Sequence, residues 1–350
     1  MSIIRTGLLL SALIASPVLA EDIVVLLPQS GPAAKAGSAV RDGLLAGYYQ
    51  TGGHRNASLV LNFRDTGSQN NIKAILDSAM TPDTRLVIGP LLRDQVSAVL
   101  ASPPSAPVLA LNDVDHLAVP GVWEFALSPD DEMAPLAEAM KQDGIQRVRI
   151  LMQADESGER LRQAFEMAWE SRNGQLLPAF ALQESSQGGI SASLRQLLAS
   201  PDTARTQAFF LATPSLALQV MPLLAFYQKQ PLKVYTTSPA FDEIAPALQR
   251  RDLNGLRFCG APWSMENRWP EQPLLAAASP PDSGSFNRLQ AFGADAWSLQ
   301  RLLPARKPLT LSLRTGNIAL DANGLQRTPV CMEILDGTPR PLTPNLRTSR

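Results

Sequence analysis

The sequence predicts an α/β protein of two lobes, each built on a doubly wound parallel sheet, with a multi-strand hinge between them. Short apolar runs rich in β-branched residues alternate with segments of helical composition, which is typical of βα units on a parallel sheet. This alternation runs through the chain twice, and 350 residues exceed what one hydrophobic core usually holds. We therefore expect one lobe for each βα array.

Residues 1–20 have the order of a secretory signal peptide. A lone arginine precedes an apolar run from Gly7 to Ala15, and Val18 and Ala20 occupy the small-residue positions that a signal peptidase reads. The run is too short to span a bilayer, and Glu21 follows the cleavage position where a lipoprotein would have cysteine. We expect a soluble, exported chain without a lipid anchor or a membrane span.

The first βα array begins with a β-branched run at Ile23–Leu27, which predicts a strand buried on both faces. The turn Pro28–Pro32 separates this strand from a helix over Ala36–Tyr49. The same alternation then predicts strand Leu59–Phe63, helix Ile72–Met80, strand Leu86–Ile88, helix Leu92–Leu100 and strand Val108–Leu111.

The second array lies between two expected crossing segments, Trp123–Asp131 and Leu256–Trp263. Its expected elements are helix Met133–Gln142, strand Val148–Met152, helix Gly158–Ser171, strand Ala179–Leu182, helix Ile190–Leu198, strand Ala208–Leu211, helix Leu216–Tyr227 and strand Val234–Thr236. An amphipathic helix over Phe286–Leu303 and two β-like runs within Leu311–Leu335, around a turn at Asp321–Gly324, follow.

These crossings divide the chain into discontinuous lobes. We assign residues 21–126 and 260–328 to the first lobe, and residues 127–259 and 329–340 to the second. Residues 341–350 are polar and rich in proline, threonine and arginine, so we expect a disordered tail there.

Composition and motifs exclude several classes of function. The net charge is −1 and the cationic residues are spread along the chain, so nucleic acid is not an expected partner. His54 and His116 have no partners at metal-ligand or triad spacing, and no nucleophile elbow or phosphate-binding loop occurs. The acidic cluster Asp130–Glu132 precedes a helix, which favours a capping role. We therefore expect neither catalysis nor a cofactor or metal.

Cys259 and Cys331 are the two cysteines of the chain. An oxidising compartment would permit a disulfide between them if the fold brings them together. Two buried thiols that act as small apolar residues fit the sequence equally well.

Eight segments resemble the C-terminal domain of the LppC/LpoA family, the outer-membrane activators of penicillin-binding proteins. In order they are VVLLPQSGPAAKAGSAVRDGLLAGYY (24–49), IGPLLRDQV (88–96), PVLALN (107–112), SPDDE (128–132), GERLRQAFEMAWESRNG (158–174), FFLATPSLALQVMPLLAF (209–226), LNGLRFCGAPW (253–263) and RLQAFGADAWSL (288–299). PVLALN and LNGLRFCGAPW are specific, whereas the SGP opening is shared with many amino-acid-binding proteins.

The resemblance implies a periplasmic-binding-protein type I fold, a location in the periplasm and a peptidoglycan synthase as partner. An alternative is a solute-binding protein that delivers an amino-acid-like or other small ligand to an ABC importer. Two features depart from the family pattern. Larger members carry a lipid-modified cysteine and a helical-repeat domain ahead of this module, and Gly260 stands where we expect an acidic residue after the cysteine.

A small ligand is expected in the cleft between the lobes, at the carboxyl ends of the strands. The loop Gln29–Pro32 precedes a helix whose first turn contains Lys35, Gly37 and Ser38, and the backbone amides at this helix start could hold a carboxylate, as in amino-acid-binding proteins of similar sequence. Alternatively, Gly31 and Pro32 make the turn and Ser30 caps the helix.

The loop after the third strand supplies a ligand-binding hydroxyl in such proteins, but Leu91 and Leu92 have none to offer. Arg93 could pair with an anion instead or be solvated. The candidate cleft residues are Ser30, Gly31, Gly89, Pro90, Arg93 and Asn112.

Overall fold

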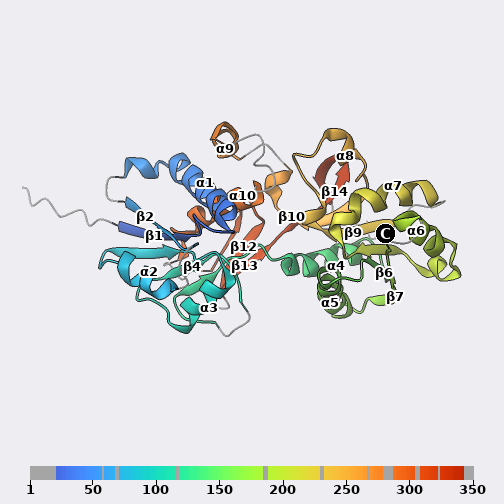
Figure 1. The fold of residues 1–350 in the computed structure, drawn as a ribbon, viewed down its shortest axis with the longest axis horizontal. Helices are drawn as coiled ribbons and strands as arrows, with labels where there is room; N and C mark the ends of the chain where they lie inside the picture. Colours follow the sequence, from blue (N-terminus) through green and yellow to red (C-terminus); the bar gives the residue numbers. More distant parts are fainter. Residues whose placement is uncertain are drawn as a thin grey trace, which may run out of the picture.

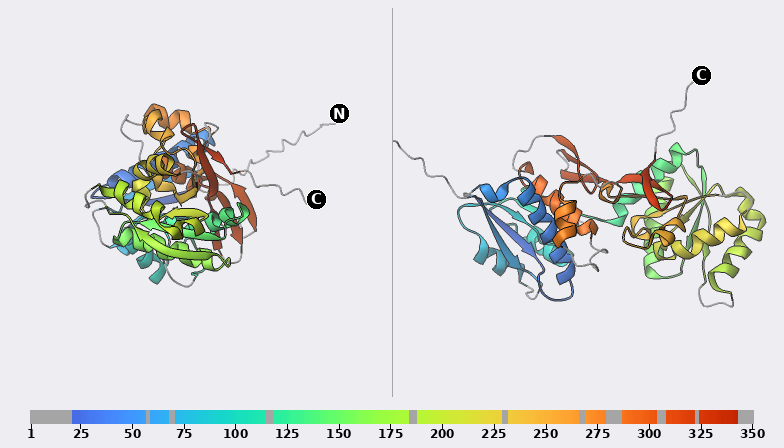
Figure 2. Two further views of the ribbon diagram at one scale, coloured as in Figure 1. Left: turned by 90° about the vertical axis from the view of Figure 1, so that its right-hand side faces the viewer. Right: turned by 90° about the horizontal axis from the view of Figure 1, so that it is seen from above.

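The computed structural model describes residues 21–56, 59–67, 71–114, 118–183, 188–228, 232–265, 269–278, 287–303, 308–321 and 324–342. The expected signal peptide, His116 and residues 343–350 of the expected tail lie outside this part of the chain. Figures 1 and 2 show two lobes side by side along the long axis, with the blue and cyan segments in one and the green and yellow segments in the other.

The first lobe contains a five-stranded parallel sheet in the order β2-β1-β3-β4-β5. Its strands are β1 (Glu21–Leu27), β2 (Leu59–Asp65), β3 (Thr84–Ile88), β4 (Val108–Ala110) and β5 (Val122–Glu124), and its helices are α1 (Ala34–Gln50), α2 (Ile72–Ala79), α3 (Arg93–Ala101) and α10 (Asn287–Leu299). Val25 lies in one core with α1 and α10, whereas Val24 lies in another with α2 and α3. Both faces of β1 are therefore buried, which explains its unbroken apolar run.

Helix α10 belongs to this lobe because it packs closely on α1. A Cβ atom at Gly43 would lie 1.8 Å from the carbonyl oxygen of Gln290, and one at Gly293 would lie 2.0 Å from that of Val40. Only glycine allows the two helix backbones to approach so closely. Trp297 is buried beside them and donates from Nε1 to the Thr51 hydroxyl at 2.8 Å.

The second lobe contains a seven-stranded sheet in the order β15-β14-β10-β9-β8-β6-β7, in which β14 is antiparallel to both of its neighbours. Its strands are β6 (Arg147–Met152), β7 (Gln175–Ala181), β8 (Ala208–Leu211), β9 (Lys233–Thr237), β10 (Leu256–Gly260), β14 (Val330–Leu335) and β15 (Thr338–Pro341), and its helices are α4 (Met133–Gln142), α5 (Glu156–Glu170), α6 (Gly189–Ala199), α7 (Ala217–Tyr227) and α8 (Ala247–Arg251). Phe209 lies in the core under α6 and α7, and Phe210 lies in the core under α4 and α5.

A third, antiparallel sheet, β11-β12-β13, packs on the core of the first lobe through Ile318 and Leu320. It consists of β11 (Leu309–Ser312), β12 (Asn317–Asp321) and β13 (Gly324–Thr328), and helix α9 (Gln272–Ala278) precedes it. The chain crosses between the lobes after β5, after β10 and between β13 and β14. Among the described residues, no helix has the length and apolar character to cross a bilayer.

The parallel sheets confirm the predicted α/β class. Helix α4 has the predicted bounds, whereas α10 ends at Leu299 instead of Leu303. Strand β5 places Trp123 and Glu124 at the edge of the first sheet, although we expected the crossing segment to begin at Trp123. Strand β15 reaches Pro341 because its backbone pairs with β14, and the Leu342 amide donates to the Cys331 carbonyl oxygen at 2.9 Å, so two residues of the expected tail are placed on the sheet.

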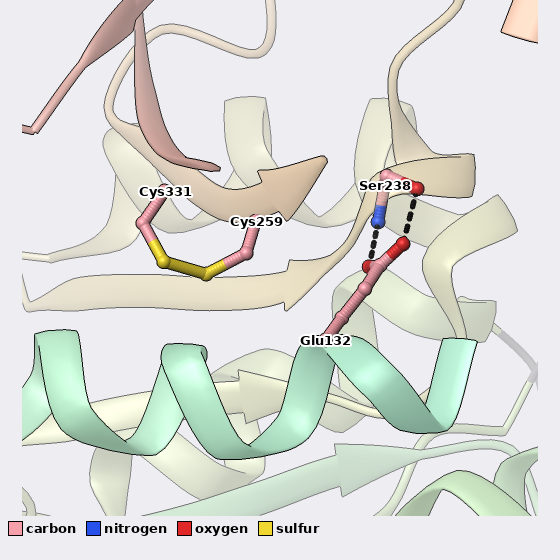
Figure 3. The surroundings of a disulfide bond; sticks show 4 residues. All are labelled: Glu132, Ser238, Cys259 and Cys331. Atoms are coloured by element: carbon pink, nitrogen blue, oxygen red, sulfur yellow. Dashed lines mark hydrogen bonds between the residues drawn. A yellow bond between two sulfur atoms is a disulfide. The ribbon is translucent and has the colours of Figure 1, made fainter. Parts of the chain in front are cut away.

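Cys259 and Cys331 lie opposite each other in the β10–β14 pair and form a disulfide with an S–S distance of 1.99 Å (Figure 3). The loop that it closes spans 72 positions and contains α9, α10 and β11–β13, the whole return of the chain into the first lobe. The antiparallel register of β10 and β14 brings the two sulfurs together, and this register could not be predicted from the sequence.

Replacing both cysteines by serine should lower the free energy of unfolding by about 4 kcal/mol, because the unfolded chain loses a long covalent loop. Denaturant unfolding followed by tryptophan fluorescence would measure the change. A reductant should destabilise the wild type and leave the double variant unaffected; equal sensitivity of the two proteins would contradict the expectation.

Candidate functional site at the hinge between the lobes

In the first sheet, β2 lies on one side of β1, whereas β3, β4 and β5 follow on the other side, so the strand order reverses between β1 and β3. Ligands of doubly wound folds bind outside the carboxyl ends of the strands at such a point. There Asp65 Oδ1 accepts hydrogen bonds from the amides of Gln29, Ser30 and Gly67 at 2.7, 3.2 and 2.8 Å. Burial raises the pKa of Asp65, but the nearby Ser30 side chain and these three amides outweigh it and hold the pKa below its usual range. The amides of Gln29 and Ser30, just ahead of the helix start, thus bind a carboxylate from the chain itself.

The turn at this loop depends on Gly31, which has a φ of +73°. A Cβ atom there would lie 2.9 Å from the carbonyl oxygen of Gly67, so a side chain would crowd the loop that carries Asp65. Ser30 does not cap α1, whose N-cap residue is Ala33.

The second loop at this point is also joined to the strands around it. Gly89 has a φ of +101°, and a Cβ atom there would lie 2.1 Å from the carbonyl oxygen of Leu26. Pro90 is buried and accepts a hydrogen bond from the Leu111 amide at 3.0 Å. Asn112 Nδ2 donates to the carbonyl oxygen of Leu91 at 2.8 Å, which connects this loop to the end of β4.

Arg93 begins α3 and forms a half-exposed ion pair with Asp113 at 3.4 Å. Gly31, Gly89, Pro90, Arg93 and Asn112 therefore have structural partners or positions, whereas the buried Ser30 hydroxyl has no hydrogen-bond partner among the described atoms. The role of these residues in binding a ligand stays a prediction. The candidates meet at the carboxyl ends of β1, β3 and β4: Ser30, Gly31, Gly89, Pro90, Arg93 and Asn112.

The second sheet reverses its order between β6 and β8, in the same way as the first. A cavity of about 320 Å³ opens there. Polar residues line much of it: Asp155, Ser157, Arg160, Thr213, Ser215 and Thr237. We did not predict these residues, although hydroxyl groups that directly follow buried strands were a usable signal.

The hinge is held by the guanidinium of Arg327, at the end of β13. Its nitrogens donate to the carbonyl oxygens of Ala126 and Thr315 at 2.8 and 3.1 Å, and to Asp131 Oδ2 at 3.0 Å. The Arg327 side chain is only 5% exposed, so these partners replace water. Since Ala126 and Asp131 belong to the first crossing, the arginine joins this crossing to the end of the third sheet.

A second connection passes through Glu132, which is buried at the start of α4 (Figure 3). Its carboxylate accepts from the Ser238 amide at 2.7 Å and from the Ser238 hydroxyl at 2.5 Å. Ser238 Oγ also accepts from Arg288 Nη1 at 2.6 Å, and Arg288 lies in the first turn of α10. This chain of hydrogen bonds links the carboxyl end of β9 in one lobe to a helix of the other.

Burial raises the pKa of Glu132 to about 7. The hydrogen bonds from Ser238 and the charges of Arg288 and Arg327 oppose this rise without cancelling it. Burial also raises the pKa of the neighbouring Asp131, against the charge of Arg327. The hinge thus holds a carboxyl group that titrates near neutral pH.

The acidic cluster lies at a helix start, as expected, but its side chains make tertiary contacts in place of capping bonds to α4. Ser128 Oγ accepts from the Asp130 amide at 3.2 Å and so caps the short helix that contains the cluster. Asp130 pairs with Arg160 at 2.9 Å, and Asp131 and Glu132 make the hinge contacts described above. Their partners lie 30 or more positions away, which is why sequence spacing did not reveal them.

The second crossing is fixed by a buried ionic network. Arg314 donates to Glu271 Oε2 and to Asp295 Oδ1, each at 3.0 Å, and Thr315 donates its amide and hydroxyl to Asp295 Oδ2 at 2.8 and 2.7 Å. The Arg314 carbonyl oxygen accepts from the Trp263 amide at 2.9 Å. These bonds attach the second crossing to α9, α10 and the third sheet. In the described part of the chain, histidine, cysteine and carboxylate side chains form no group of three that could hold a metal ion.

A family model described as LppC putative lipoprotein matches residues 15–328. The chain belongs to the LppC family. Among curated relatives, the penicillin-binding protein activators LpoA of Haemophilus influenzae and Escherichia coli are each 26% identical, over 91% and 70% of this chain. The matches cover 54% and 41% of those proteins, so the LppC chain spans about half the length of the relatives it matches.

Solved structures show the same fold. The LpoA (YraM) C-domain from Haemophilus influenzae, described as a regulator of PBP1A, matches with a TM-score of 0.73 and 24% identity, over 92% of this chain and all of that domain. A putative branched-chain amino acid ABC transporter protein from Chromobacterium violaceum matches with a TM-score of 0.69 and 23% identity, over 89% and 99% of the two chains. The predicted periplasmic-binding-protein-like fold is confirmed.

Position 260 differs from the acidic residue that we expected in an LppC protein. A Cβ atom at Gly260 would lie 3.1 Å from Ser238 Cβ and 3.3 Å from Met332 Cε. An acidic side chain would therefore crowd Ser238, whose amide and hydroxyl bond Glu132.

Glu132→Gln should remove one pH-dependent contribution to stability. Because the pKa of Glu132 is raised from 4.5 to about 7 in the fold, its contribution is complete below pH 4.5 and is lost as the pH rises through 7. The free energy of unfolding of the wild type, relative to the variant, should thus fall by up to about 3 kcal/mol between pH 4.5 and 7.5. Denaturant unfolding across this pH range would measure the difference.

Glu159→Gln is the matched control. Glu159 is exposed and pairs with Arg162, which lowers the pKa of Glu159 to about 2. In this variant the free energy of unfolding should therefore change with pH as it does in the wild type. If the free energy of unfolding of Glu132→Gln changes with pH as in the wild type, the Glu132 carboxyl group does not titrate in this pH range.

Proposed function

We propose that this LppC protein is a non-catalytic regulator that acts in the periplasm by binding a peptidoglycan synthase. The family match over residues 15–328 carries the proposal, together with curated relatives that are named penicillin-binding protein activators. The described fold corresponds to the whole of a domain that is described as a regulator of PBP1A. Because the chain spans about half of those relatives, their activity is extended to it here as a proposal.

Two features of the chain support an exported, non-catalytic role. The Cys259–Cys331 disulfide suits an oxidising compartment. The buried carboxylates at the hinge are paired with arginine or serine partners, which suits a structural role better than acid–base chemistry.

The alternative, delivery of a small ligand to an ABC importer, rests on the fold shared with solute-binding proteins. An amino-acid ligand fits the first lobe poorly, because Asp65 occupies the amides of Gln29 and Ser30. Partly buried hydrogen bonds from Arg288 and Arg327 also cross the hinge on which closure around a solute would depend.

Immobilised mature chain should retain a bifunctional penicillin-binding protein from a periplasmic and membrane extract, and should raise its rate of glycan polymerisation when added to the purified synthase. Retention with mass-spectrometric identification, and a polymerisation assay on lipid-linked substrate, would measure the two effects. The same chain unfolded by denaturant and reductant is the negative control.

Failure of both assays with folded chain would refute the regulatory proposal. A rise in melting temperature with an amino acid or small amide, together with no retained synthase, would favour the transport alternative.

A further inference from the structure

The cavity at the strand-order reversal of the second sheet has the properties of a ligand site. It is formed by the loops after β6 and β8, by the end of β9 and by the first turns of α5. We infer that it binds a neutral, hydroxyl-rich small molecule of the sugar class. The inference goes beyond the proposed regulation of a synthase and does not depend on it.

Thr237, at the end of β9, gives the first reason. The residue is fully buried, lines the cavity, and its hydroxyl has no hydrogen-bond partner among the described atoms. A buried hydroxyl without a partner is costly, so a native fold keeps one chiefly where something else completes it. The preceding Thr236 shows the contrast, since its hydroxyl donates to the Leu211 carbonyl oxygen at 2.8 Å.

The remaining polar groups offer both donors and acceptors. Thr213 Oγ1 accepts from the Gln153 amide at 2.8 Å, which leaves its hydrogen to donate. Asp155 uses Oδ1 to accept from the Gly158 amide at 2.7 Å, which leaves Oδ2 as an acceptor. Ser157 and Ser215 add two further hydroxyls to the lining. A ligand whose own groups both donate and accept, as sugar hydroxyls do, matches this set.

The charges around the cavity argue against an ionic ligand. Asp155 would repel a carboxylate, and Arg160 would repel a cation. Arg160 is also already paired with Asp130 at 2.9 Å. Leu161, Pro214 and Pro239 supply apolar surface for the C–H faces of a ring. The volume of about 320 Å³ lies at the small end of ligand pockets, which suits a single sugar unit.

Calorimetric titration of the mature chain with glucose and N-acetylglucosamine, and with leucine and 4-hydroxybenzoate as charged comparators, tests the inference. We expect saturable binding of at least one sugar and none of the comparators. Thr237→Val should weaken sugar binding about tenfold, because one hydrogen bond is lost. It should leave the unfolding midpoint unchanged or raise it, since the hydroxyl has no partner within the fold.

Thr236→Val is the matched control. It removes a hydroxyl that bonds the chain itself, so the unfolding midpoint should fall while sugar affinity stays at the wild-type value. Three results would overturn the inference: no saturation by either sugar, tighter binding of a comparator, or wild-type sugar affinity in Thr237→Val. Because no synthase takes part in these titrations, their outcome is separate from that of the retention assay.

Discussion

The relative placement of the two lobes depends on a buried guanidinium. Arg327 comes from the third sheet, yet it donates to Ala126 and Asp131 of the first crossing. Burying a charge is expensive unless each of its hydrogen-bonding groups finds a partner, and Arg327 finds two carbonyl oxygens and a carboxylate. Removal of any one partner would leave polar groups buried without compensation. The crossings therefore behave as one unit, to which Glu132 and Arg288 add a second connection through Ser238.

The two strand-order reversals have the same topology and different chemistry. In the first lobe, the Asp65 carboxylate takes the amides of the first loop, and the Gly89 backbone lies against β1. In the second lobe, an open cavity is lined by hydroxyl groups, among them that of Thr237. Topology alone assigns both points to ligand binding. The side chains distinguish the two points, because in the first lobe the Asp65 carboxylate occupies backbone amides that could bind a ligand anion.

Much of the fold could be predicted from the sequence because its signals are local. The apolar run of β1 and the helical composition of α4 depend on neighbours a few positions apart, and the expected bounds of α4 are those of the structure. The site could not be predicted in the same way. Asp65 bonds amides 35 and 36 positions away, and Glu132 bonds Ser238 across 106 positions. Pairing of Cys259 with Cys331 likewise depends on the β10–β14 register. These partners meet only when the chain folds, so their spacing along the sequence does not reveal them.

The hinge contacts also bear on the choice between regulator and shuttle. A shuttle encloses its solute by rotating its lobes, and rotation here would disturb the Arg327–Asp131 and Arg288–Ser238 contacts together. Each contact involves a charged group that is wholly or partly buried, so separation would cost more than separation of an exposed pair. A protein that holds its lobes at a fixed angle presents a constant surface, which suits recognition of another protein. A ligand in the second-lobe cavity would then bind without closure, because the lining residues of this cavity all belong to the second lobe.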